Sequence, residues 1–174
     1  MSDGEHPRLV PLPEADWDPR LDGVLARLDP VLNVHRVLAH HPDLLAAWSS
    51  LRHHIAFAGS LLPRHRELLI LRIAHRAGSG YEWHHHVIRG RAAGLSDDEI
   101  AAIGGGRTGD WTEIDGALLS AADELFDSRS IGQPTWAALA AGLSQEQLLD
   151  VVMTVRVYVT LAMVIAATGV SIEA

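Results

Sequence analysis

Four residues whose side chains can move protons lie close together in this sequence: Glu67, Ser79, Glu82 and His86. The last three follow one another at positions i, i+3 and i+7, so on a helix they form one narrow stripe. Glu82 and His86 are four residues apart, which lets a carboxylate and an imidazole meet across one turn, setting the tautomer and raising the basicity of the imidazole. We therefore predict a proton-transfer site with His86, Glu82 and Glu67 as its catalytic residues.

Glu67 is predicted to lie on an apolar helix face, because the residues three, four and seven positions after it are isoleucine, leucine and alanine. A carboxylate in such a place is either paired or has a raised pKa, since desolvation disfavours its charged form. Two interpretations stay open. Glu67 is a general acid or base, or it forms a buried ion pair with an arginine from elsewhere, because Arg72 and Arg76 are poorly spaced for it.

Ser79 and Glu82 also fit a structural role. The pattern S-x-x-E at the start of a helix is a capping box, and similar boxes occur at Ser96 and Ser144. Capping explains Ser79 as well as substrate binding does, and both interpretations stay open. It explains Glu82 less well, because His86 follows one turn later on the same face.

The aromatic and histidine residues around Glu82 suggest further contacts. Tyr81 and Trp83 are candidate substrate-binding residues together with Ser79, although aromatic side chains here more often pack in a core. The run His84–His86 invites a metal interpretation. Consecutive helical residues point about 100 degrees apart, so three in a row do not chelate one ion, and we expect no metal.

The elements that position these residues are predicted to be helices in one all-α domain. Residues 1–20 contain four prolines and are predicted to form an extended arm, with the helical domain spanning 21–174. Proline, glycine and capping residues punctuate the rest of the chain. They predict helices over 21–28, Pro30–Ala39, Asp43–Phe57, Pro63–Ala77, Tyr81–Ala93, from Ser96 to Gly104, from Asp110 to Phe126, Pro134–Ala141, and from Ser144 to Thr168.

Composition excludes several classes of function. A formal net charge of −8 with no basic patch argues against a nucleic-acid partner. The chain of 174 residues has no cysteine, so a disulfide, a thiolate nucleophile and thiol peroxidase chemistry are excluded. The N-terminus has early acids and no apolar run before a cleavage site, which is unlike a signal peptide and predicts a cytoplasmic protein.

Residues 151–170 are apolar except for Arg156 and a few threonines. A run of about 20 apolar residues is long enough to span a bilayer, but a helix that is apolar all round also suits the core of a bundle or an oligomer interface. Arg156 lies well inside the run and no basic flank marks a cytoplasmic side, so we predict a buried helix and no membrane association.

The segment Arg66–Ile100, RELLILRIAHRAGSGYEWHHHVIRGRAAGLSDDEI, resembles the carboxymuconolactone decarboxylase family, which includes the alkylhydroperoxidase D-like proteins. LAHHPDLLAAW at Leu38–Trp48 and the C-terminal helices are similar to that family too, so the resemblance covers roughly residues 30–170. It implies a helical bundle, normally assembled as trimers or hexamers. The peroxidase branch carries a C-x-x-C whose cysteines align with Ser79 and Glu82, so this chain departs from it.

What remains, Glu67, Glu82 and His86, resembles the decarboxylase-like branch and implies cofactor-free chemistry on a small organic acid, lactone or ketone. His86, oriented by Glu82, would donate or shuttle the proton, and Glu67 would be a second acid or base or a positioning group. A carbon–carbon lyase is the leading expectation. The alternatives are a noncatalytic oligomeric binding or scaffold protein of the same fold and a peroxidase relative without thiol peroxidase activity.

Overall fold

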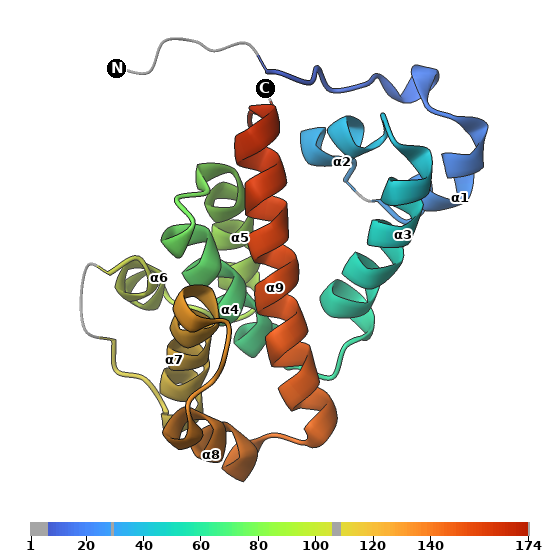
Figure 1. The fold of residues 1–174 in the computed structure, drawn as a ribbon. Coiled ribbons are helices and arrows are strands. Elements are labelled where there is room, and N and C mark those ends of the chain that lie inside the picture. Colours follow the sequence, from blue (N-terminus) through green and yellow to red (C-terminus); the bar gives the residue numbers. More distant parts are fainter. Residues whose placement is uncertain (1–6, 29, 106–108, 174) are drawn as a thin grey trace. The chain divides into compact units, whose positions relative to one another are not determined.

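The computed structural model describes residues 7–28, 30–105 and 109–173, which contain α-helices and no β-strand (Figure 1). The predicted all-α fold is confirmed. The nine α-helices of these ranges are α1 (Asp22–Leu25), α2 (Asn33–Leu38), α3 (Pro42–His53), α4 (Pro63–Arg76), α5 (Gly80–Ala92), α6 (Asp97–Ile103), α7 (Glu113–Ser128), α8 (Gln133–Gly142) and α9 (Gln145–Thr168).

Local signals set the boundaries of the helices that carry the predicted site. α4 begins at Pro63, in the first turn, where the missing N–H of proline costs no hydrogen bond. After α5 the chain turns at Gly94, whose φ of 92° favours glycine. α6 and α9 start after Ser96 and Ser144, and each start is closed by the two reciprocal bonds of a capping box. The predicted ends of these helices therefore agree with the structure to within one residue or two.

Three predicted helices near the N-terminus differ in extent. The first, over 21–28, is a 3-10 turn followed by the single turn α1. The second, predicted from Pro30, starts three residues later, because Nδ1 of His35 accepts the backbone N–H of Leu32 at 3.0 Å and caps the helix there. The third, predicted to reach Phe57, ends as an α-helix at His53 and continues as a π-helical turn.

Contacts between Cα atoms divide the chain into two compact units, Met1–Ala58 with Met163–Ala174 and Gly59–Ala162. In the first unit, Trp17 and Leu45 belong to one buried apolar cluster. Trp17 lies in the predicted arm, whose described part forms two 3-10 turns. The predicted division into an arm, 1–20, and a domain, 21–174, stays a prediction.

α4 is the helix of the second unit that contacts both α5 and α7. Over residues 68–74 every side chain but one is buried, as expected for a helix enclosed on nearly all sides. α5 approaches it closely at Gly90, where a Cβ atom would lie 3.1 Å from side-chain carbons of Leu71 and Leu95. The same point lies 4.0 Å from Cβ of Glu67, so the small residue brings α5 up to the predicted catalytic acid.

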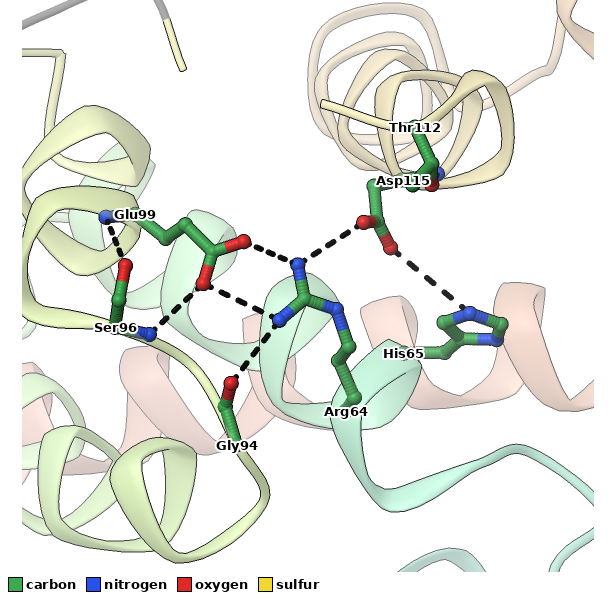
Figure 2. Close-up of polar contacts among 7 residues, drawn as sticks. All are labelled: Arg64, His65, Gly94, Ser96, Glu99, Thr112 and Asp115. Carbon is green, nitrogen blue, oxygen red and sulfur yellow. Dashed lines mark hydrogen bonds and ion pairs between the residues drawn. The ribbon is translucent and has the colours of Figure 1, made fainter. Parts of the chain in front are cut away.

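Figure 2 shows the ionic network that anchors the first turn of α4. Arg64 donates to both carboxylate oxygens of Glu99 on α6, and at 3.0 Å to Oδ2 of Asp115 on α7. Its guanidinium also donates to the carbonyl of Gly94 at 3.3 Å. Because Glu67 lies only three residues further along α4, this network fixes the helix that carries it.

α9 is long and apolar enough to cross a membrane by length and composition, and 61% of its most apolar window is buried in the protein. The core helix of a soluble protein passes the same test. Arg156 donates to the carbonyl of Leu125 at 3.4 Å, and Asp150 accepts from the backbone N–H and hydroxyl of Ser60 at 2.6 and 2.8 Å. These contacts agree with the predicted buried helix.

Candidate active site

Glu67 on α4 and His86 on α5 meet where the two helices pack together. Nδ1 of His86 lies 2.7 Å from Oε2 of Glu67, and the two residues are only 4% and 2% exposed. A nitrogen-to-oxygen distance this short is typical of a hydrogen bond that involves a charged group. The helix packing therefore joins two predicted site residues that are 19 positions apart in the sequence.

The partner of His86 differs from the predicted one. Glu82 is buried one turn before His86 on α5, as the spacing predicts, but Glu67 of the neighbouring helix occupies Nδ1. The group that orients the imidazole is therefore Glu67, and Glu82 is left for another role.

Hydrogen bonds at both ring nitrogens define the protonation state of His86. A terminal nitrogen of Arg89 lies 3.1 Å from Nε2. Because a guanidinium only donates, Nε2 must supply its lone pair, so the proton sits on Nδ1 and points to Glu67. Burial lowers the pKa of His86, and this outweighs the opposing hydrogen bond from Glu67. His86 is therefore a neutral imidazole.

Glu67 is held as a carboxylate. Burial favours its protonated form, but the hydrogen bond to His86 and the charges of Arg66 and Arg89 outweigh burial and keep the pKa of Glu67 below its usual value. Nε of Arg66 lies 3.3 Å from Oε1. Of the two interpretations left open by the sequence, the structure shows the ion pair, with the adjacent Arg66 as the partner, and the role of Glu67 as a general acid or base stays a prediction.

The three S-x-x-[E/Q] patterns behave differently once folded. At Ser96 and Ser144 the residue at the third helical position returns a hydrogen bond to the serine N–H, completing the capping box. At Ser79 the hydroxyl accepts from the N–H of Glu82 at 3.4 Å, but the serine N–H donates to the carbonyl of Ala74. Ser79 is therefore a cap, and the carboxyl group of Glu82 takes no part in capping.

The carboxyl group of Glu82 is buried, and neither oxygen meets a donor in hydrogen-bonding geometry among the described residues. Burial raises the pKa of Glu82 to about 7, against the opposing influence of the Ser79 hydroxyl. An unpaired buried carboxyl costs folding free energy, and groups with such perturbed pKa values gather at functional sites. With this pKa, the carboxyl group of Glu82 is partly protonated and partly ionised at neutral pH.

Of the aromatic residues near Glu82 and His86, one packs in an apolar cluster and two contact histidines. Trp83 packs with Val87 against the apolar cluster that α4 and α6 share. This is the packing role that the sequence offered as the alternative to substrate binding. Tyr81 is buried with its ring 4.7 Å from that of His85. The ring of Tyr158 on α9 meets His86 edge to face at 5.0 Å and forms a wall of the site that the sequence did not indicate.

Sequence reasoning also missed Arg66 and Arg89. Arg89 extends the stripe of Ser79, Glu82 and His86 by three further residues, so continuing the same helical spacing would have found it. Arg66 is adjacent to Glu67 in the sequence, and only the folded geometry shows that its guanidinium reaches the carboxylate.

A separate pocket of about 430 Å³ lies in the second unit. Its walls include Arg72, Trp111 and Asp123, but no predicted site residue. Arg72 and Asp123 are paired through two hydrogen bonds of 2.8 Å, so the charged groups of this pocket already satisfy one another. Within the described ranges, no three His, Asp or Glu side chains are placed to hold a metal ion.

The fold is that of the alkylhydroperoxidase D-like proteins. A variant of the debrominase Bmp8 in complex with 2,3,4-tribromopyrrole has a TM-score of 0.80 and 22% identity, over 99% of this chain and 95% of that one. A peroxidase-related protein from Silicibacter sp. TM1040 has a TM-score of 0.81 and 18% identity, over 100% and 96% of the two chains. An alkylhydroperoxidase AhpD core protein from Ralstonia eutropha JMP134 gives 0.80 and 19%, over 97% and 94%.

Residues 42–123 match the carboxymuconolactone decarboxylase family, and this stretch, which includes Glu67, Glu82 and His86, belongs to it. The resemblance noted in the sequence is confirmed over this stretch, which contains no cysteine. Among proteins with curated functions, none matches the chain significantly.

Proposed function

We propose that this protein is a cofactor-free proton-transfer enzyme of the carbon–carbon lyase type that acts on a small organic acid, lactone or ketone. The observation that carries the proposal is the buried, unpartnered carboxyl group of Glu82, one helical turn from the His86–Glu67 pair. A neutral imidazole and a carboxyl with a pKa of about 7 are a matched base and acid at neutral pH.

In this proposal the two glutamates exchange the roles expected from the sequence. Glu67 holds the tautomer of His86 and stabilises the imidazolium once a proton is gained. Glu82 donates a proton to carbon, and His86 shuttles a proton from solvent back to Glu82 for the next turnover. In a decarboxylation, the bond to the leaving carboxylate breaks, its electron pair enters the conjugated carbonyl, and the proton from Glu82 completes the product as carbon dioxide departs.

Ser79, Tyr81 and Trp83 were the expected substrate-binding residues. Ser79 and Tyr81 remain candidates, because both are buried near Glu82. Ser79 is the N-cap of α5, and Tyr81 directly precedes Glu82 in that helix. Trp83 acts through packing instead, since it supports the helix from the core side.

We also propose that the protein is a cytoplasmic homo-oligomer, a trimer or hexamer. Exposed Leu149 and Met153, four residues apart on α9, support such association.

The alternative function, a noncatalytic binding or scaffold protein, draws support from the internal pairing of Glu67 and His86. A purely structural cluster is expected to pair every buried polar atom. Glu82 departs from that expectation, which favours the enzyme.

The test is to incubate the protein in D2O with a panel of small carboxylates, lactones and ketones. NMR monitors hydrogen–deuterium exchange at carbon, and release of carbon dioxide is measured in parallel. We add 2,3,4-tribromopyrrole because the similar debrominase was crystallised with it. Turnover of any member should be lost in His86→Gln and kept in His84→Gln, an exposed histidine on the same helix. Equal turnover by the protein and His86→Gln would refute the assignment, and a panel without turnover would favour the scaffold.

A further inference from the structure

Two arginines converge on the His86–Glu67 pair, one at each end. Arg66 contacts Glu67 through Nε at 3.3 Å, and Arg89 contacts His86 through one terminal nitrogen at 3.1 Å. Both side chains are partly exposed. Neither guanidinium has another hydrogen bond or ion pair among the described residues, so each keeps unpaired N–H donors beside the site.

The charges of this cluster do not balance. Glu67 supplies one negative charge, Arg66 and Arg89 supply two positive charges, and His86 is neutral. When Glu82 is protonated, one positive charge is left over, in a chain whose formal net charge is −8. A local surplus of this sign attracts a small anion.

The hydrogen bond from Arg89 to His86 is weaker than the bonds that the same guanidinium would form with a carboxylate. It offers one N–H to a neutral lone pair, whereas a carboxylate accepts two parallel, charge-assisted bonds. A carboxylate that enters the site would therefore compete successfully for Arg89. Once Arg89 turns to the anion, Nε2 of His86 loses its donor and its lone pair becomes free to accept a proton.

We propose that Arg89 is an anion-operated switch that keeps Nε2 of His86 occupied until the carboxylate of a substrate draws the guanidinium away. The inference rests on the proton-transfer part of the proposed function, not on the lyase step, and it narrows the substrates to small monocarboxylates with an acidic C–H next to a carbonyl. In the step that follows, the C–H bond breaks, its proton moves to Nε2, and its electron pair enters the carbonyl to form an enolate. Return of a proton from solvent restores the substrate or its isomer.

Other groups that touch His86 do not perform this function. Glu67 binds Nδ1, Tyr158 meets the ring edge to face, and the charge of His85 lowers the pKa of His86. Of the described residues, only Arg89 donates to Nε2, so occupancy of that atom reports on the position of Arg89.

The test is ¹⁵N NMR of the full chain with labelled histidine, in which the His86 resonances are assigned by their loss in His86→Gln. Sodium acetate is the probe, and sodium chloride at equal ionic strength is the control. We expect acetate, and not chloride, to move the Nε2 resonance saturably toward the position of an unbonded lone pair. Arg89→Met should start at that position and show no response, whereas Arg91→Met, an exposed position paired with Asp97, should respond normally.

A second variant tests the anion site without touching the switch. Arg66→Met should weaken acetate binding while leaving the resting Nε2 resonance unchanged. An Nε2 resonance insensitive to acetate in the unaltered protein, or an Arg89→Met variant that still responds, would overturn the proposal. His86-dependent exchange without an acetate response refutes the switch alone. An Arg89-dependent acetate response without turnover supports the anion site and refutes the proposed function.

Discussion

Oε2 of Glu67 accepts a hydrogen bond of 2.7 Å from Nδ1 of His86, and Arg89 occupies the opposite nitrogen of the same ring. The imidazole is thereby fixed in one tautomer by groups from two helices. Its outer nitrogen is the only one at which it exchanges a proton without breaking the bond to Glu67. We therefore expect Glu67 to position His86, so that its loss would change both the chemistry and the packing of the site.

Substitution Glu67→Gln should lower any His86-dependent rate about 10²-fold or more, because a neutral amide does not stabilise an imidazolium. It should also lower the free energy of unfolding by about 2 kcal/mol, since Arg66 loses its partner and a charge-assisted bond is lost. Rate measurements and urea unfolding check the two effects. A variant with full activity would show that Glu67 is merely structural.

The pH dependence of stability should carry the signature of Glu82. Its pKa in the folded protein is about 7, above the ordinary 4.5, so the folded state binds the proton more tightly than the unfolded state. The protein therefore loses stability as pH rises from about 4.5 to 7. In Glu82→Gln this loss should disappear. As pH rises from 5 to 8, the free energy of unfolding of the variant should therefore increase by on the order of 2 kcal/mol relative to that of the unaltered protein. Parallel curves for the two proteins in urea titrations would contradict a buried acid.

The same carboxyl should shape the pH dependence of the rate. Neutral His86 and protonated Glu82 are both required, so the rate should rise as His86 loses its proton and fall above about pH 7 as Glu82 ionises. Glu82→Gln should be slow and lack the alkaline decline. A pH profile of initial rates checks this, and an alkaline decline retained in the variant would assign it to another group.

Acid stability should depend on Glu99, far from the chemistry. The hydrogen bond with Arg64 lowers the pKa of Glu99 to about 2. The contribution of the Glu99 carboxylate to the free energy of unfolding is therefore complete above the ordinary pKa of 4.5 and is lost as pH falls toward 2. Glu99→Gln should cost on the order of 2 kcal/mol at pH 7 and nothing near pH 2. Exposed Glu113→Gln is the control, and equal losses in both variants would show that the network in Figure 2 adds no stability.

The sequence by itself determined the helices after residue 60 and the alignment of Ser79, Glu82 and His86, because caps, prolines, glycines and helical spacing act over a few residues. It did not show how extensive the N-terminal helices are, because a side chain of α2 caps its own helix and α3 runs into a π-helical turn.

Only the tertiary structure decided which carboxylate orients His86. Glu82 is closer along the chain, but packing of α4 against α5 at Gly90 places Glu67 on the ring. Packing also distinguished three similar serine motifs, leaving the carboxyl of one buried and unpaired while the other two close as caps. Burial and contacts between helices depend on residues distant in sequence, and they set the pKa of Glu82 and the proton position on His86.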